Sequence, residues 1–366
     1  MFDFASRRTR ARSRMQQEGM EAMLLFLSSN LLYLTGWTDA PGERFLGVLL
    51  TCDREAMIVP RLYADEVATH VGVADVRICD DESSPFDQVA ALAREFGVSR
   101  GRWAVDDSLP FLMVTRLQAA VPGCTLVPAS RALAPLRAQK EPGEVEWMRH
   151  AARITEEAVT ETLSDVRPGL AARDVAAAIE DRMRRKGASA VASSIVAVGT
   201  TAAMPHARAG EELLKSREVL LIDVGCRCQG YRSDLTRTYV LGEASARVGH
   251  AYRAVRDAYE AARALIRPGR PLGEVDRVAR DVITKAGFGS NFIHRLGHGI
   301  GLDPKEEPYA VAGNPNPCLP GHTFSVEPGV YFPGKFGLRL EDVVVVTETG
   351  NEALTDLPRE LGVLPT

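Results

Sequence analysis

The sequence predicts an α+β protein of two domains, in which an α/β domain precedes a domain built on a curved mixed or antiparallel sheet. Strand-like and helix-like segments alternate up to about residue 135, and a polar link interrupts them at residues 138–144. Beyond the link, single acidic residues and one histidine stand inside strand-like apolar runs. With 366 residues and 45% hydrophobic composition, the chain is long enough for both domains to bury a core.

Residues 1–137 are assigned to the first domain. The basic start at residues 6–14 is predicted to be a solvated first helix, because no apolar stretch follows that would make it an export or transit peptide. Short continuous apolar runs are typical of buried strands, and three-to-four-residue apolar spacing is typical of amphipathic helices. The expected strands are 23–27, 45–51 and 55–59, and the expected helices are 61–70, 85–96 and 110–120.

Residues 144–366 are assigned to the second domain. Pro142 and Gly143 end regular structure and favour the start of a helix, and the next twenty residues carry apolar side chains at helical spacing. The expected helices are 144–164, 171–187, 244–266 and 273–287. The expected strands are 219–224, 236–241, 322–327 and 338–346.

Bulk properties restrict the class of protein. The formal net charge is −4 and the pI is near 6.0, which argues against a nucleic-acid partner. No apolar run approaches the roughly 18 residues of a membrane span, so no membrane partner is expected. The six cysteines are scattered and form no disulfide-dense pattern, which fits a reducing compartment. We therefore expect a cytoplasmic protein.

Five residues of the second domain predict a metal centre. Asp223, Asp234, His298, Glu327 and Glu341 lie in apolar runs or between glycines, where ionised groups need a partner. Hairpins are expected to bring Asp223 beside Asp234 and Glu327 beside Glu341. Four carboxylates and one imidazole in one place need positive charge, which two divalent ions would supply. This oxygen-rich set favours Mn²⁺ first, with Co²⁺ or Zn²⁺ as alternatives.

Three segments around these residues, 230–238, 294–302 and 324–331, resemble the "pita-bread" metallopeptidases, and the resemblance covers nearly the whole chain. That family includes methionine aminopeptidase, aminopeptidase P, prolidase and the creatinase branch. The first domain resembles the creatinase-type module of the proline-specific members. The resemblance implies that Asp223 holds one metal, that His298 and Glu327 hold the other, and that Asp234 and Glu341 bridge the two.

The resemblance also implies roles for residues around the metals. Glu327 would move a proton from a bridging water to the leaving proline nitrogen, and His206 and His294 would contact the substrate and the tetrahedral intermediate. Two further substrate-side positions match, Tyr231 and Arg339, and Arg339 would orient carboxylates near the site.

Two departures from the family pattern concern the substrate. The family has a second histidine seven residues after the metal-binding one, and here that position is Lys305. An arginine that precedes the Glu-Pro-Gly motif in eukaryotic-type prolidases is also missing. The loop at residues 36–44 offers a substitute, with Asp39 meeting the substrate amine and Arg44 its carboxylate. Such loops reach the partner subunit's site in this family, so we expect a homodimer.

These features predict a dinuclear metallopeptidase that cleaves Xaa-Pro dipeptides through a metal-bridging hydroxide. Such a bond is a tertiary amide without an N–H group, which explains the need for a dedicated enzyme. Three alternatives stay open. The first is an aminopeptidase P that acts on longer Xaa-Pro peptides, and the second is a weakly active or non-peptidase member in which Lys305 replaces the family histidine. The third is an amidohydrolase of small non-peptide substrates.

Overall fold

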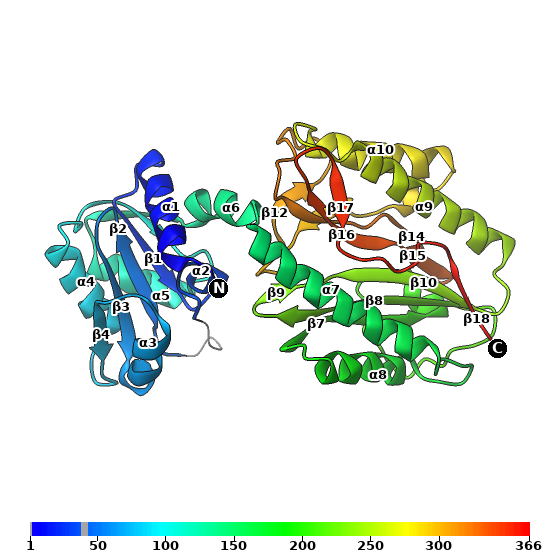
Figure 1. The fold of residues 1–366 in the computed structure, drawn as a ribbon, viewed down its shortest axis with the longest axis horizontal. Coiled ribbons are helices and arrows are strands. Elements are labelled where there is room, and N and C mark those ends of the chain that lie inside the picture. The colour runs from blue at the N-terminus through cyan, green and yellow to red at the C-terminus, as the bar shows by residue number, and fades with distance from the viewer. Residues whose placement is uncertain (1, 38–42) are drawn as a thin grey trace. The chain divides into compact units, whose positions relative to one another are not determined.

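The structure is a computed structural model that describes residues 2–37 and 43–366. The chain divides into two compact units, Met1–Arg137 and Ala138–Thr366, and each is described by itself (Figure 1). Across the described residues, every helix is too short or too polar to cross a membrane.

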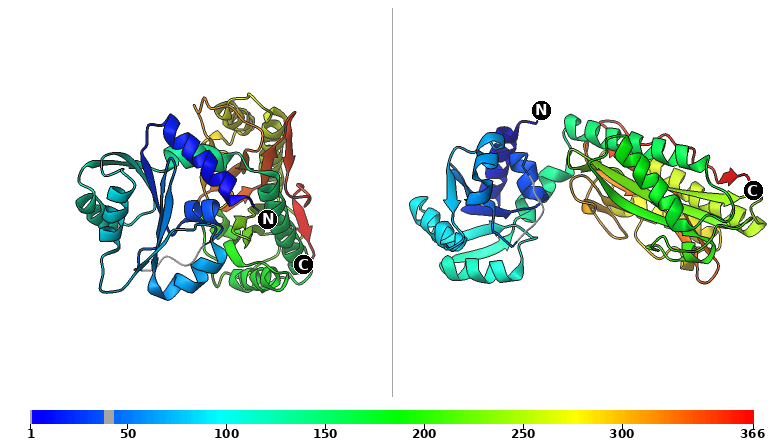
Figure 2. Two further views of the ribbon diagram at one scale, coloured as in Figure 1. Left: turned by 60° about the vertical axis from the view of Figure 1, so that its left-hand side comes forward. Right: turned by 90° about the horizontal axis from the view of Figure 1, so that it is seen from below.

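The N-terminal unit is built on a six-stranded mixed sheet with the strand order β4-β3-β2-β1-β5-β6. The central strand β1 is wholly buried; it pairs antiparallel with β2 and parallel with β5. Helices lie on both sides of the sheet, which is seen nearly edge-on in the left view of Figure 2. The strands are β1 (Ala22–Phe26), β2 (Gly47–Thr51), β3 (Glu55–Pro60), β4 (Val76–Cys79), β5 (Gly101–Val105) and β6 (Cys124–Pro128). The helices are α1 (Phe4–Gln17), α2 (Ser29–Thr35), α3 (Ala64–His70), α4 (Pro85–Glu95), α5 (Phe111–Ala120) and α6 (Ser130–Ala138).

Helix α1 forms where the basic start was expected to be helical, but the expectation that it is solvated is wrong for two of its arginines. Arg7 and Arg8 are 1% and 5% exposed. Their guanidinium groups donate to the carbonyls of Tyr33 and Leu34 in the last turn of α2, at 3.2 and 3.1 Å. Those carbonyls have no partner inside their own helix, so an arginine that reaches them also neutralises the negative end of the helix.

The C-terminal unit is built on a ten-stranded sheet whose main order is β12-β11-β13-β16-β10-β8-β7. Helix α7 runs across one face of this sheet in Figures 1 and 2. The strands are β7 (Ala190–Val198), β8 (Val219–Cys228), β9 (Tyr231–Arg232), β10 (Leu235–Leu241), β11 (Gly297–Gly299), β12 (Glu306–Ala310), β13 (Thr323–Val326), β14 (Gly329–Phe332), β15 (Phe336–Arg339), β16 (Glu341–Val346), β17 (Asn351–Ala353) and β18 (Gly362–Leu364). The helices are α7 (Pro142–Leu163), α8 (Ala172–Arg185), α9 (Ala246–Leu265) and α10 (Leu272–Lys285).

Strand β8 shows how this sheet carries two cores and a polar site. Leu220, Ile222 and Val224 pack in one core with α7 and α8. Leu221, on the other face of the strand, packs in a second core with α9 and α10. Side chains alternate along a strand, so Asp223 continues the second face. The predicted fold class is confirmed: the protein is α+β, with a curved, largely antiparallel sheet in the C-terminal unit.

The last predicted strand, 338–346, is interrupted in the structure. β15 ends at Arg339 and β16 begins at Glu341, with Leu340 between them. β15 pairs with β14 as a separate two-stranded hairpin, whereas β16 joins the large sheet between β13 and β10. Because of this change of partner, Arg339 and Glu341 belong to different sheets, although the apolar pattern of the sequence continues through both strands.

Candidate metal centre

The five predicted metal-binding residues come from five neighbouring strands. In sheet order, His298 lies on β11, Glu327 directly follows β13, Glu341 begins β16, Asp234 directly precedes β10, and Asp223 lies on β8. In the pairing register, Thr236 of β10 stands opposite Glu341 on one side and opposite Asp223 on the other. The structure therefore brings together residues that are more than one hundred positions apart in the chain.

Three of these residues form the tightest group. Ligand atoms of Asp234, His298 and Glu341 all lie within 4.8 Å of one another. Glu327 is adjacent, since its Oε1 is 3.4 Å from His298 Nε2. The carboxylates are also held by hydroxyl groups: Thr236 Oγ1 donates to Glu341 Oε2 at 2.6 Å. Ser325 Oγ likewise donates to Glu327 Oε1 at 3.0 Å.

The carboxylates of this group resist ionisation in the metal-free protein. Burial and then the charges of Asp223 and Glu327 raise the pKa of Asp234 well above its ordinary value. Burial and then the charge of Asp234 do the same to the pKa of Glu341. Burial also raises the pKa of Glu327, to about 7. Desolvation and like charge both penalise the ionised form, so the group is short of positive charge.

His298 is prepared to act as a ligand. Its Nδ1 lies 3.1 Å from the carbonyl oxygen of Gly299, which can only accept, so Nδ1 carries the proton and Nε2 presents its lone pair. Burial lowers the pKa of His298 to about 4, which keeps the imidazole neutral. Gly297 and Gly299 are required by space, because a Cβ at either would lie within 2.5 Å of the backbone of a neighbouring strand.

Arg339 is the buried cation of the site. It is 2% exposed, it forms an ion pair with Asp223, and its Nη1 donates to Tyr331 Oη at 2.6 Å. Burial opposes its charge, but Tyr331, Asp223 and Glu341 outweigh that effect and raise its pKa above the ordinary value. Arg339 therefore stays protonated and holds Asp223 through their ion pair.

Tyr331 links Arg339 to His294, a connection that sequence reasoning missed. His294 Nδ1 donates to the carbonyl oxygen of Arg295 at 2.7 Å, so its Nε2 accepts from Tyr331 Oη at 3.1 Å. Burial lowers the pKa of His294 to about 4, which keeps the ring neutral in this chain of contacts. The motif at 324–331 contained Tyr331, but only the return of β14 against β15 shows which groups its hydroxyl joins.

His206 and Lys305 lie at the exposed side of the site. His206 is exposed and makes no hydrogen bond or ion pair within residues 2–37 and 43–366, and its charge acts on His294. Lys305 is also exposed, and its charge offsets part of the rise in the pKa values of Asp234 and Glu327. Both side chains are thus near the buried group and accessible to a ligand.

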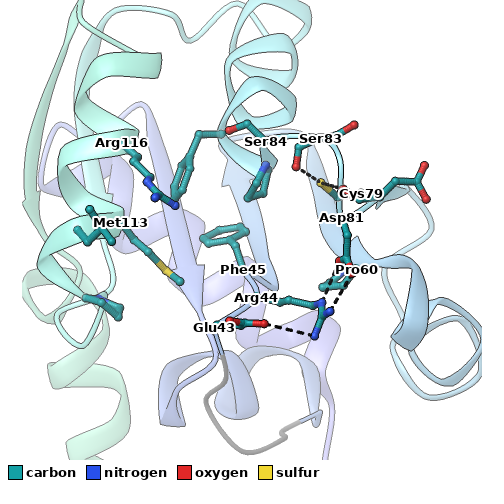
Figure 3. Close-up of a pocket in the computed structure, with 15 residues that line it drawn as sticks. Glu43, Arg44, Phe45, Pro60, Cys79, Asp81, Ser83, Ser84, Met113 and Arg116 are labelled. Carbon is teal, nitrogen blue, oxygen red and sulfur yellow. Dashed lines mark hydrogen bonds and ion pairs between the residues drawn. The ribbon is translucent and has the colours of Figure 1, made fainter.

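The remaining predicted substrate contacts have other partners. Tyr231 is 2% exposed, and its hydroxyl donates to Glu144 Oε1 at 2.7 Å, at the first turn of α7. Arg44 forms a two-bond ion pair with Asp81, at 2.9 and 2.8 Å, beside a cavity of about 830 Å³ in the N-terminal unit (Figure 3). Asp39 lies outside the described residues.

The residues present fit divalent cations. Four carboxylates share the site with one guanidinium, so their formal negative charge exceeds the positive charge of Arg339. A buried ion without a partner costs several kcal/mol. Oxygen ligands with one imidazole suit Mn²⁺, Co²⁺, Fe²⁺ or Zn²⁺. Within the part of the chain that the structure describes, the Asp234, His298 and Glu341 group is the one cluster with metal-ligand geometry.

Comparison with known proteins agrees with this geometry. The chain matches metallopeptidase family M24 over residues 146–348 and the creatinase/prolidase N-terminal domain over residues 7–139. A probable dipeptidase PepE of Mycobacterium bovis is 36% identical, over 99% of this chain and 97% of its own. An Xaa-Pro dipeptidase of Lactobacillus helveticus is 33% identical, over 91% and 92%. The crystal structure of a prolidase from Thermococcus sibiricus matches with a TM-score of 0.94 and 32% identity, covering 100% of both chains.

These matches confirm the resemblance on which the sequence predictions rested. They extend over both units. The match to family M24 includes the strands that carry the candidate metal ligands. The chain therefore belongs to metallopeptidase family M24, with a creatinase/prolidase N-terminal domain ahead of the peptidase domain.

Proposed function

We propose that this protein is an Xaa-Pro dipeptidase whose C-terminal unit holds two divalent ions through Asp223, Asp234, His298, Glu327 and Glu341. The observation that supports the proposal is that these residues stand on or next to five neighbouring strands, with the ligand atoms of Asp234, His298 and Glu341 within 4.8 Å of one another. Family membership implies divalent metal ions, and relatives bear the names Xaa-Pro dipeptidase and prolidase. Mn²⁺ is the preferred ion of this proposal, with Co²⁺ or Zn²⁺ as alternatives.

The ions would supply two effects, a lower pKa for an attacking water and polarisation of the scissile carbonyl. Glu327 serves as the proton carrier. Its Oε1 is held by Ser325, and its Oε2 takes up a proton and delivers it to the leaving proline nitrogen. A carboxylate can accept a proton from the attacking water and then release it to the leaving nitrogen.

Three residues serve the substrate and the developing charge. His206, which is exposed and has no protein partner in the described residues, donates to the oxygen of the tetrahedral carbon. His294 is held in one orientation by Tyr331 and lies close enough to His206 to be affected by its charge. Lys305 provides a positive charge at the exposed side, where a dipeptide carboxylate or the oxyanion is stabilised.

Peptide hydrolysis tests the proposal. Metal-stripped protein, with and without added Mn²⁺, is given Ala-Pro, Ala-Ala and Ala-Pro-Ala. The proposal expects Mn²⁺-dependent cleavage of Ala-Pro and much slower cleavage of the other two. Glu327→Gln, which keeps the shape of the side chain but cannot carry the proton, should lower kcat on Ala-Pro by at least about a hundredfold. Cleavage of Ala-Pro without metal would refute it.

The second candidate is an Xaa-Pro aminopeptidase, and the observation that favours it concerns Arg44. In this chain the Arg44 guanidinium is already paired with Asp81, so it is a weaker candidate for a dipeptide carboxylate clamp. Preference for Ala-Pro-Ala over Ala-Pro would select this function. Two bound ions with no cleavage of either peptide would instead select the weakly active reading, in which Lys305 fails to replace the family histidine.

Assembly and compartment belong to the same proposal. A homodimer would let the loop at residues 36–44, with Asp39 and Arg44, act at a partner's site. Sedimentation of the wild type beside Arg44→Ala, together with KM values for Ala-Pro and Ala-Pro-Ala, tests this role. All six cysteines are free thiols, which accords with the cytoplasm.

A further inference from the structure

We propose that Lys140 and Glu306 form a positioning pair, which holds the turn at residues 303–305 so that the Lys305 ammonium group stays at the exposed side of the metal centre. The inference rests on the proposed function for the role of Lys305. It adds a residue, Lys140, that no motif of the metal centre contains and that lies over 150 positions earlier in the chain.

The pair is buried and short. Lys140 Nζ lies 2.6 Å from Glu306 Oε1, and the two side chains are 1% and 9% exposed. Lys140 is fixed at its backbone as well, because its N–H donates to the carbonyl of Gly321 at 2.9 Å. A buried ion pair adds little net stability relative to an apolar pair, and specifying one arrangement is a role such pairs can have.

The second oxygen of Glu306 connects the pair to the turn. Glu306 Oε2 accepts from the backbone N–H of Asp303 at 3.2 Å, which closes the turn over Lys305. Glu306 also begins β12 and stands opposite Gly299 of β11, next to His298. Glu306 therefore joins Lys140 and the turn through its carboxylate, and it joins the strand of the candidate metal ligand through its place in β12.

The surroundings leave room for this pair and for little else. A Cβ at Gly301 would lie 2.6 Å from Glu306 Oε1 and 2.7 Å from Lys140 Cε, so a side chain there would have to displace the pair. On the other side of the turn, Arg232 donates through its backbone to Gly301 O at 3.0 Å and through Nε to Leu302 O at 3.1 Å. The turn is thus fixed at both ends, and Pro304 and Lys305 are the exposed residues between them.

The position of Lys305 matters because Lys305 directly precedes Glu306, which stands opposite Gly299 of β11, next to the candidate ligand His298. A lysine side chain is a flexible point charge, so its effect depends on where its backbone is anchored. A displacement of about 1 Å in a catalytic group can cost up to a hundredfold in rate.

The test combines a structural signal with a double-mutant cycle. The chain has six lysines, so selective ¹⁵N-lysine labelling gives six amide signals, each assigned by a Lys→Arg variant. Lys140→Met should shift or broaden the Lys305 signal and leave those of Lys215, Lys285 and Lys335 in place. Lys140→Met/Glu306→Gln removes both charges, so no unpaired ion stays buried, and it should move the Lys305 signal in the same way.

The matched control is Lys186→Met, which breaks a lysine–glutamate contact of 2.9 Å at a half-buried position between α7 and α8 and should leave the Lys305 signal unchanged. With Ala-Pro as substrate, Lys140→Met should lower kcat about tenfold relative to the wild type. Added to Lys305→Ala, it should lower kcat by less than about twofold relative to Lys305→Ala alone. A role limited to folding would lower kcat equally in both backgrounds.

Two results would overturn the inference: an unchanged Lys305 amide signal in folded Lys140→Met and Lys140→Met/Glu306→Gln, or equal losses of kcat in the two backgrounds. Failure of the proposed function is a separate result. If the wild type cleaves neither Ala-Pro nor Ala-Pro-Ala, the proposed activity is wrong, and the amide signals still decide whether Lys140 positions Lys305.

Discussion

Arg237→Met is expected to weaken both the C-terminal unit and its metal site. Arg237 is 2% exposed and uses all its donors: it forms an ion pair with Asp342 at 2.7 Å. Its other bonds go to backbone carbonyls of Thr236, Glu341, Leu357 and Pro358, at 2.7 to 2.9 Å. The residue thereby joins β10, β16 and the C-terminal segment behind the candidate ligand Glu341.

The expected loss of stability follows from what the variant leaves behind. Removing one partner of a buried pair costs about 3–5 kcal/mol. Asp342 keeps Arg359 at 2.7 Å and the hydroxyl of Thr355 at 2.5 Å, so the lower end applies. We expect a loss of about 3 kcal/mol, which is roughly 10 °C in Tm for a unit of this size. Displacement of Glu341 should weaken Mn²⁺ binding about tenfold.

Urea unfolding followed by circular dichroism measures the stability change, and titration calorimetry measures Mn²⁺ affinity. The matched control is Arg256→Met, since Arg256 pairs with Asp257 at the surface with both side chains more than a third exposed. Exposed pairs contribute less than about 1 kcal/mol. A loss for Arg237→Met no larger than for Arg256→Met would refute the reasoning, because it would mean that the buried contacts around Arg237 add nothing to the fold.

Three further outcomes are expected. Tyr331→Phe removes the hydroxyl between His294 and Arg339, so kcat on Ala-Pro should fall about tenfold with little change in KM; a change in KM alone would contradict this. Burial lowers the pKa of His322 to about 4 from an ordinary value near 6.5, so the unfolded state binds the proton more tightly. The contribution of neutral His322 to the free energy of unfolding is complete above pH 6.5 and is lost as the pH falls towards 4. The loss totals up to about 3 kcal/mol, and Tm curves of His322→Asn should lack that part of the slope. Finally, Tm of the metal-stripped protein should rise with Mn²⁺, by the equivalent of about 2.7 kcal/mol at a hundred times Kd, whereas an unaltered Tm would argue against a metal site.

Local patterns in the chain predict the fold class, most of the helices and part of the strands, and the motifs around the acidic residues indicate the family. Helices α4, α7 and α10 begin and end within two residues of the predicted ranges, because apolar spacing and a proline at or next to the start are local signals. Local patterns also marked the five candidate ligands, since four lone acids in apolar runs and one histidine between two glycines are visible without knowing their spatial neighbours.

How those residues come together depends on the pairing of whole strands. The order β11-β13-β16-β10-β8 places the candidate ligands side by side, and strand order depends on pairing between distant segments that local pattern does not encode. The same holds for the side chains whose partners are far away in the chain. Arg7 turned out to be buried against the last turn of α2, Tyr231 bonds to Glu144, and Lys140 reaches Glu306 across 166 positions. Such contacts follow from the packing of whole elements, and therefore from the complete fold.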